Sequence, residues 1–126
     1  VKELTNGNGA DVIYDPVGGD VFDESIRCIN WGGRLLVIGF AGGRISNLPV
    51  NYPLIKGFSV IGVRAGEYGR KNPDLGKENI DIINNLANEG KLKPHICKIF
   101  SFEHSLKALK YLKDRKLIGK VVISIS

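Results

Sequence analysis

The stretch GGRLLVIGFAGGR, residues 32–44, sets an apolar run directly before a glycine-rich turn. Within it, RLLVIGF is almost continuously apolar, a pattern typical of strands that are covered on both faces, as in parallel sheets. Gly39 ends the run, and Gly42 and Gly43 follow within four residues. Glycine permits a close approach to the backbone. The stretch therefore predicts a buried strand followed by a turn whose backbone can be approached closely.

The flanking segments predict an alternation of strands and helices. ADVIYD, residues 10–15, indicates a short strand between two glycine-rich turns. From Asp20 the apolar residues recur at helical spacing, and the WGG triplet is expected to close that helix. FSVIGVRA, residues 58–65, predicts another apolar strand, and the polar segment EYGRKNP after it is expected to form a loop.

Beyond the glycine-rich turn the pattern becomes mixed. Residues 41–57 are too rich in Pro and Gly for a long helix. Apolar residues between Leu75 and Leu86 predict a helix that ends at the NEG triplet. HICKIF predicts a strand, Ser101 is the expected N-cap of a following helix, and GKVVISIS predicts a last strand.

This order of elements favours an α/β fold with a parallel sheet. Strands that alternate with helices are typical of right-handed crossovers. Three strands leave the first one without an outer neighbour, and the chain begins at Val1 and contains no methionine. We therefore expect the second half of a doubly wound sheet from a longer protein, followed by a small strand–helix–strand segment.

Composition narrows the class of protein. A chain of 126 residues, 43% of them hydrophobic, suits one globular domain, and no apolar run reaches the length of a membrane-spanning helix. Cys28 and Cys97 lie far apart, which argues against a disulfide framework or a zinc site and favours a reducing compartment. The net charge of +5 would suit nucleic acid or an anionic cofactor, although solvated helix lysines are the favoured explanation.

Three predicted strand ends carry glycine-containing loops, DPVGG, GFAGG and VRAGE. Ligands of doubly wound sheets bind outside the carboxyl ends of the strands, so these loops are candidate contacts, with simple chain turning as the alternative. None fits a phosphate-binding fingerprint, which favours a flat ring as the ligand. Asp15 caps a turn or contacts a sugar hydroxyl, with the turn favoured. No side chain stands out as a general acid or base.

Four motifs together carry a resemblance to a known family. They are D-x-V-G-G at 15–19, G-G-R-x-x-x-x-G at 32–39, K-x-x-x-x-x-G at 56–62 and G-K-x-V at 119–122. Over essentially the whole chain, this combination resembles the C-terminal part of the medium-chain dehydrogenases/reductases, and among them the zinc-independent, zeta-crystallin-like NAD(P)H:quinone oxidoreductases. The resemblance implies that residues 1–93 form the C-terminal half of a Rossmann dinucleotide-binding domain. It implies that residues 94–126 return to a GroES-like catalytic domain.

The resemblance also implies contacts to a cofactor, NADPH with NADH as the alternative. The loop after the second strand would lie against the nicotinamide, with Ile38, Gly39, Phe40 and Ala41. The third strand end, Val63, Arg64 and Ala65, would offer backbone groups to the carboxamide. Val17 and Gly18 would pass near a ribose, and Arg115 would reach the cofactor phosphates. The resemblance assigns no catalytic residue and no metal ligand to this chain.

By the same resemblance, the protein would transfer hydride from the nicotinamide to a quinone. The alternatives are an NADPH-dependent enoyl or alkene reductase of the same superfamily and a non-catalytic truncated fragment, and the isolated chain is expected to be inactive. The resemblance further implies a cytoplasmic homodimer formed through residues 58–65. Such pairing would cover an exposed sheet edge. Neither a membrane nor nucleic acid is expected as a partner.

Overall fold

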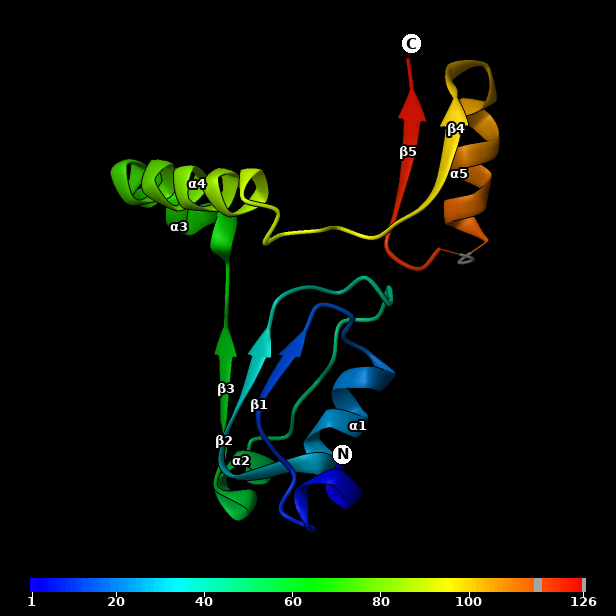
Figure 1. The fold of residues 1–126 in the computed structure, drawn as a ribbon. Coiled ribbons are helices and arrows are strands. Elements are labelled where there is room, and N and C mark those ends of the chain that lie inside the picture. The colour runs from blue at the N-terminus through cyan, green and yellow to red at the C-terminus, as the bar shows by residue number, and fades with distance from the viewer. Residues whose placement is uncertain (115–116, 126) are drawn as a thin grey trace. The chain divides into compact units, whose positions relative to one another are not determined.

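The computed structural model of the protein describes residues 1–114 and 117–125. These residues divide into two compact units, Val1–Lys71 and Asn72–Ser126. Unit 1 holds a three-stranded sheet and unit 2 a two-stranded sheet, both parallel (Figure 1). The predicted α/β class with parallel strands is therefore confirmed. The expected division into residues 1–93 and 94–126 concerns the domains of a longer protein and stays a prediction.

The sheet of unit 1 has the strand order β1–β2–β3. A 3-10 turn, η1 (Lys2–Thr5), precedes the strands, which are β1 (Ala10–Asp15), β2 (Ile29–Val37) and β3 (Ser59–Gly62). Asp15 pairs with Val37, and Val37 pairs with Gly62. The three strands therefore end level with one another, and their loops leave the sheet at one edge.

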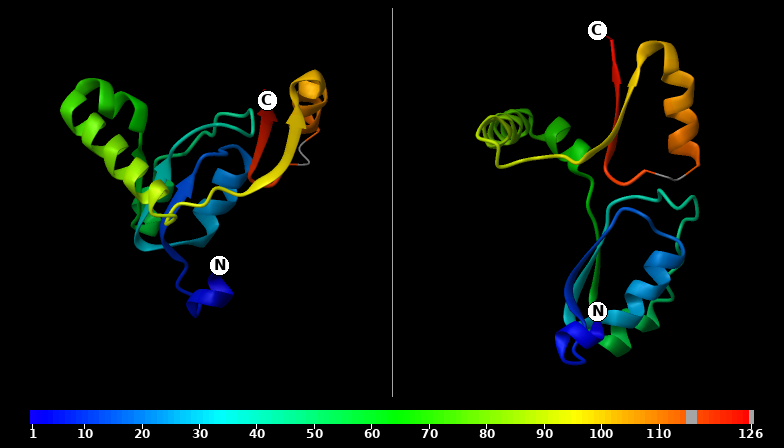
Figure 2. Two further views of the ribbon diagram at one scale, coloured as in Figure 1. Left: turned by 45° about the horizontal axis from the view of Figure 1, so that its top comes forward. Right: turned by 45° about the vertical axis from the view of Figure 1, so that its right-hand side comes forward.

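The core of unit 1 lies between this sheet and helix α1 (Asp20–Cys28), which runs along the sheet in both views of Figure 2. Leu35, at the centre of β2, is completely buried. Buried and partly buried apolar residues surround it: Phe22, Ile26, Ile29, Phe58, Ile13, Val37 and Leu48. On the opposite face of β1, Val12 and Tyr14 are exposed. The sequence predicted a sheet covered on both faces, but within the described residues the face of β1 opposite to the core is not covered.

Helix α1 ends earlier than its sequence pattern predicts. Its last residue is Cys28, and β2 begins at once with Ile29. The expectation that WGG closes the helix is wrong, because this triplet lies inside β2, where the pairing with β1 slips in register. Gly32 has a φ of 72° and donates its N–H to the carbonyl oxygen of Gly57 at 2.6 Å. Glycine here serves an irregularity of the strand rather than a helix end.

Two short helices complete unit 1. Helix α2 (Asn51–Lys56) agrees with the expectation that no long helix forms in residues 41–57. Helix α3 (Ala65–Lys71) replaces the loop expected at EYGRKNP, so that expectation is wrong. Glu67 forms ion pairs with Arg64 at 3.7 Å and Arg70 at 3.3 Å, each three residues away. This spacing places the charges on one helix face, where their attraction favours helix over loop.

Unit 2 combines one long helix with a strand–helix–strand segment. The elements are α4 (Pro73–Asn88), β4 (Ile96–Ser101), the 3-10 helix η2 (Phe102–His104), α5 (Ser105–Lys113) and β5 (Lys120–Ser124). The predicted helix that stops at NEG is present, and its last residue, Asn88, is the first of that triplet. The two predicted strands and the helix between them are also present. Ser101 is the N-cap residue of η2, which begins at Phe102 and leads directly into α5, although its side chain makes no capping hydrogen bond. The predicted N-cap position is therefore confirmed for this helical segment, whose α-helical part begins at Ser105.

Candidate functional site

The carboxyl edge of the unit 1 sheet brings together most of the predicted cofactor contacts. Residues 17–18 follow β1, residues 38–41 follow β2, and residues 63–65 follow β3. Backbone hydrogen bonds continue past the strand ends. Ile38 N–H donates to the carbonyl oxygen of Asp15 at 2.9 Å, and Val63 N–H donates to that of Val37 at 2.9 Å. Three segments far apart in sequence thus form one surface. The predicted phosphate contact, Arg115, lies outside the described residues.

Asp15 shapes the loop that follows β1. Its side chain is buried, with 2% of the residue exposed. Its Oδ1 accepts hydrogen bonds from the N–H groups of Val17 at 2.8 Å and Gly18 at 2.9 Å. A carboxylate that accepts bonds from backbone amides two and three residues on closes an Asx-type turn. Of the two roles left open for Asp15, the structure shows the turn.

The glycines after β2 are close to the neighbouring loop. Ala41 N–H donates to the carbonyl oxygen of Pro16 at 3.1 Å, and Gly42 N–H donates to that of Val17 at 2.8 Å. A Cβ at Gly42 would stand 3.0 Å from the Val17 oxygen, and one at Gly39 would stand 3.3 Å from the Pro16 oxygen. The loop after β1 is therefore a close neighbour of this turn within the protein itself.

Phe40 packs over the turn at Gly18. Gly18 has a φ of +68°, and a Cβ there would stand 3.0 Å from Cδ1 of Phe40. The phenyl side chain nevertheless keeps 45% of the residue surface exposed. An aromatic ring held by one loop, yet open on another side, can contact a planar ligand with its free surface.

The backbone after β3 is approachable at this edge. Gly62 ends the strand, and a Cβ on it would have no heavy atom within 4 Å. Val63 is partly buried, and its N–H is engaged with Val37. The carbonyl oxygen of Arg64 accepts bonds from the first turn of α3. These contacts hold the strand end in place, while Gly62 leaves room for a group to approach the backbone.

The chemistry of this edge fits a nicotinamide ring. The loops at this edge carry the apolar residues Val17, Ile38, Phe40 and Val63, all of them partly or largely exposed, and the buried carboxylate of Asp15 is already engaged. Such a surface suits a flat, uncharged ring that carries a carboxamide. Among residues 1–114 and 117–125, no group of three or more His, Cys, Asp or Glu residues could hold a metal ion.

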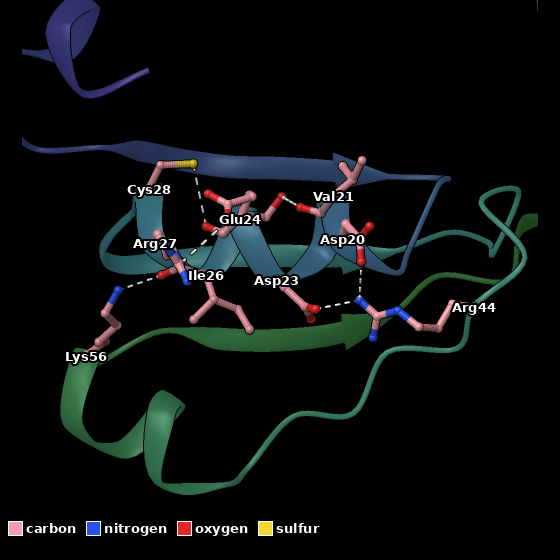
Figure 3. A network of polar contacts seen from close by, with 10 residues as sticks. Asp20, Val21, Asp23, Glu24, Ile26, Arg27, Cys28, Arg44 and Lys56 are labelled. Carbon is pink, nitrogen blue, oxygen red and sulfur yellow. Dashed lines mark hydrogen bonds and ion pairs between the residues drawn. The ribbon is translucent and has the colours of Figure 1, made fainter.

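A charged contact ties the loop after β2 to the start of α1 (Figure 3). Nη2 of Arg44 lies 2.8 Å from Oδ1 of Asp20 and 2.5 Å from Oδ2 of Asp23. Hydrogen bonds to Asp23 and then Asp20 raise the pKa of Arg44 above its usual value. Close by, Gly19 N–H donates to Oγ of Ser46 at 2.8 Å. Sequence reasoning missed these contacts, although acidic residues in the first turn of a helix are a signal for a basic partner.

The lysine of the K-x-x-x-x-x-G motif has a structural role. Nζ of Lys56 donates a hydrogen bond of 2.6 Å to the carbonyl oxygen of Ile26, near the C-terminal end of α1 (Figure 3). A cation is favourable there because the last carbonyl groups of a helix carry partial negative charge. The lysine of the motif thus connects α2 to the end of α1 rather than contacting the candidate site.

Comparison with known proteins decides the family. Residues 1–123 match the zinc-binding dehydrogenase family. The chain belongs to this family. It is 41% identical over 125 residues to the quinone oxidoreductase-like protein 2 homolog of Nematostella vectensis, covering 98% of this chain and 34% of that protein. It is 30% identical over 113 residues to the acryloyl-coenzyme A reductase of Sulfurisphaera tokodaii, covering 89% and 31%.

A solved structure extends the likeness to the fold of this zinc-binding dehydrogenase segment. The quinone oxidoreductase of Pseudomonas syringae superposes with a TM-score of 0.78 at 26% identity, covering 98% of this chain and 38% of that chain. The predicted resemblance to the quinone oxidoreductase-like medium-chain dehydrogenases/reductases is confirmed, and with it the Rossmann-like second half. The chain spans about a third of the length of the curated relatives.

Within the described part of the chain, no helix is long and apolar enough to cross a membrane.

Proposed function

We propose that the protein is an NAD(P)H-dependent oxidoreductase that transfers hydride to a quinone. Membership of the dehydrogenase family supports the reaction class, and the names of two similar proteins support the quinone. One structural observation carries the proposal. The strand ends Asp15, Val37 and Gly62 are level with one another, so the loops that follow them lie together where doubly wound sheets bind ligands.

Each loop has a role in this proposal. A reduced nicotinamide supplies the hydride when it is bound. Ile38, Gly39, Phe40 and Ala41 would bind one face of the ring and exclude water from it, while Val63, Arg64 and Ala65 would orient its carboxamide. Asp15 would act indirectly, since its turn holds Val17 and Gly18 beside the ribose. We assign the cofactor as NADPH, with NADH as the alternative, and Arg115 to its phosphates.

The first test is cofactor binding by the natural full-length protein. We expect saturable binding of NADPH, measured by the change in its fluorescence, and oxidation of NADPH when a quinone is added. NADH measured in parallel decides the preferred cofactor. Absence of saturable binding of either nucleotide would contradict the proposal.

Two variants of one loop locate the site. Phe40→Ala removes the aromatic surface over Gly18 and is expected to weaken NADPH binding about tenfold, a typical effect of one aromatic contact. Ile45→Ala is the matched control, because Ile45 is also a large apolar residue of this loop, with 73% of its surface exposed, and belongs to none of the proposed contacts. Equal affinities of the two variants would place the nicotinamide elsewhere.

A second candidate function is an NADPH-dependent enoyl or alkene reductase. The similarity to an acryloyl-coenzyme A reductase favours it. The ratio of kcat/KM for a quinone and for an acryloyl thioester separates the two reactions. A higher value for the thioester would replace the quinone by an activated alkene. Turnover of neither substrate would favour the third possibility, a non-catalytic fragment.

We also propose that residues 58–65 form a homodimer interface. β3 lies at an outer edge of the sheet, and Val60 and Ile61 on it are 37% and 39% exposed. Pairing of two such edges would satisfy their backbone groups and cover these side chains. Light scattering of the full-length protein at micromolar concentration is expected to give the mass of a dimer. A monomer would contradict this interface.

A further inference from the structure

The loop that follows β2 has a composition that favours mobility. Three of the five residues in 39–43 are glycine, and glycine loses more conformational freedom on ordering than any other residue. Gly43 has a φ of +88° and no heavy atom within 4 Å of a Cβ position, so packing does not restrain it. The loop is nevertheless folded against residues 16–17. A contact at its far end would restrain it.

Arg44 supplies such a contact immediately after Gly43. Its guanidinium binds Asp20 and Asp23, which stand 24 and 21 residues earlier in the chain, and Figure 3 shows both contacts converging on one end of the side chain. The pairs reach from the loop to the first turn of α1. They therefore close the loop at the end opposite to β2.

The same contact changes the charge beside the candidate site. Asp20 lies two residues after Gly18, which corresponds to at most about 7 Å along the backbone. A charge that lies within about 8 Å of a bound anion, the Debye length at physiological salt, is only partly screened from it. Asp20 and Asp23 would repel an anionic dinucleotide, and the Arg44 cation offsets that repulsion.

We propose that Arg44 is a positioning residue that orders the glycine-rich loop 39–43 and shields an anionic cofactor from Asp20 and Asp23. Only the shielding of the cofactor rests on the proposed function. The ordering of the loop concerns the protein without cofactor. The two halves are therefore tested by different measurements.

The ordering is tested by amide hydrogen exchange in the natural full-length protein without cofactor. In Arg44→Gln, we expect the N–H groups of Ala41 and Gly42 to exchange about fivefold faster, a ratio typical of the loss of exposed ion pairs. Arg27→Gln is the matched control, since Arg27 forms an exposed ion pair with Glu24 at 3.6 Å on the same helix. Unchanged exchange in Arg44→Gln, or equal acceleration in both variants, would overturn the ordering role.

The shielding is tested by the affinity for NADPH at low and high salt. We expect Arg44→Gln to weaken binding several-fold relative to the natural protein at low salt, and salt to reduce this ratio because it screens the uncovered carboxylates. Arg44→Lys should retain most of the affinity, and Asp20→Asn with Asp23→Asn should restore part of it in Arg44→Gln. A merely structural role would give a ratio that neither salt nor the aspartate substitutions change, and that result would overturn the shielding.

The outcomes also separate this inference from the proposed function. If the natural protein binds no NADPH, the proposed function and the shielding both fail, while hydrogen exchange still decides the ordering of the loop. If it binds NADPH with an affinity that Arg44→Gln leaves unchanged at every salt concentration, the proposed function stands and the shielding is wrong.

Discussion

Units 1 and 2 both place amphipathic helices on parallel strands, yet they bury very different amounts of apolar surface. In unit 1, Phe22, Leu35 and Phe58 are at most 6% exposed. In the described part of unit 2, Ala108 is the one buried apolar residue, and Leu106 and Leu109 on the same helix are 79% and 58% exposed. Helical periodicity therefore marks a face for burial in both units. Burial itself requires a facing surface, which the sheet of unit 1 supplies.

The largest expected effect comes from the centre of unit 1. Leu35→Ala removes a completely buried side chain and should lower the free energy of unfolding by about 3 kcal/mol, because it forfeits apolar burial and leaves a cavity. Urea denaturation measures the change. In unit 2, Leu109→Ala is the matched substitution at an exposed position and should cost less than about 0.5 kcal/mol. Equal losses in the two variants would break the comparison between the units.

The next effect concerns close packing at the carboxyl edge of unit 1. Gly42→Ala would bring a Cβ to 3.0 Å from the carbonyl oxygen of Val17, and the required shift of the loop should cost about 1–2 kcal/mol of unfolding free energy. Gly62→Ala, at the open end of β3, has no neighbour within 4 Å and should leave stability unchanged or slightly raised. A loss at Gly62 as large as that at Gly42 would show that crowding against the Val17 oxygen does not explain the loss at Gly42.

A smaller effect is expected where α2 meets α1. Lys56→Met keeps the length of the side chain and removes the bond to the Ile26 carbonyl oxygen, so urea denaturation should show a loss of about 1 kcal/mol. Lys107→Met on α5 of unit 2 removes an exposed lysine and serves as the control, with a change within about 0.5 kcal/mol. A neutral result at Lys56 would show that water replaces its bond without loss.

The smallest effect is a pH dependence in unit 2. A hydrogen bond from the Ser101 side chain, and then a backbone bond, lower the pKa of Glu103 below its ordinary value of 4.5. The folded state therefore favours the ionised carboxylate. Its contribution to stability is complete above about pH 4.5 and is lost as the pH falls through the lowered pKa.

The measurement is the urea midpoint as a function of pH in the acidic range. The urea midpoint should fall less steeply below pH 4.5 in Glu103→Gln than in the unsubstituted protein. Glu78→Gln, at an exposed position of α4, should leave this fall in the midpoint unchanged. Identical profiles of Glu103→Gln and the unsubstituted protein would rule out the contribution of this carboxylate.

Much of the fold could be predicted from local sequence. β1 begins and ends where ADVIYD does, and α4 ends at Asn88 of the NEG triplet, because strand periodicity and helix-stopping residues act within a few positions. The errors fall where one local signal has two uses. The glycines of WGG suit a helix end or an irregular strand, and the pairing of β2 with β1 selects the strand. The polar residues around Glu67 are compatible with a loop and with an exposed helix alike. The ion pairs of Glu67 with residues three positions away favour the helix.

For the candidate site, the sequence determined which residues follow strand ends and that several of them are glycine. Parallel strands place those ends at one edge, so the location of the site was predictable. Only the tertiary structure decided which glycine lies against a neighbouring chain segment, as Gly42 does, and which faces open space, as Gly62 does. It also decided that Arg44 meets Asp20 and Asp23. The physical reason is that distances between segments remote in sequence arise from strand register and helix packing, which no local pattern encodes.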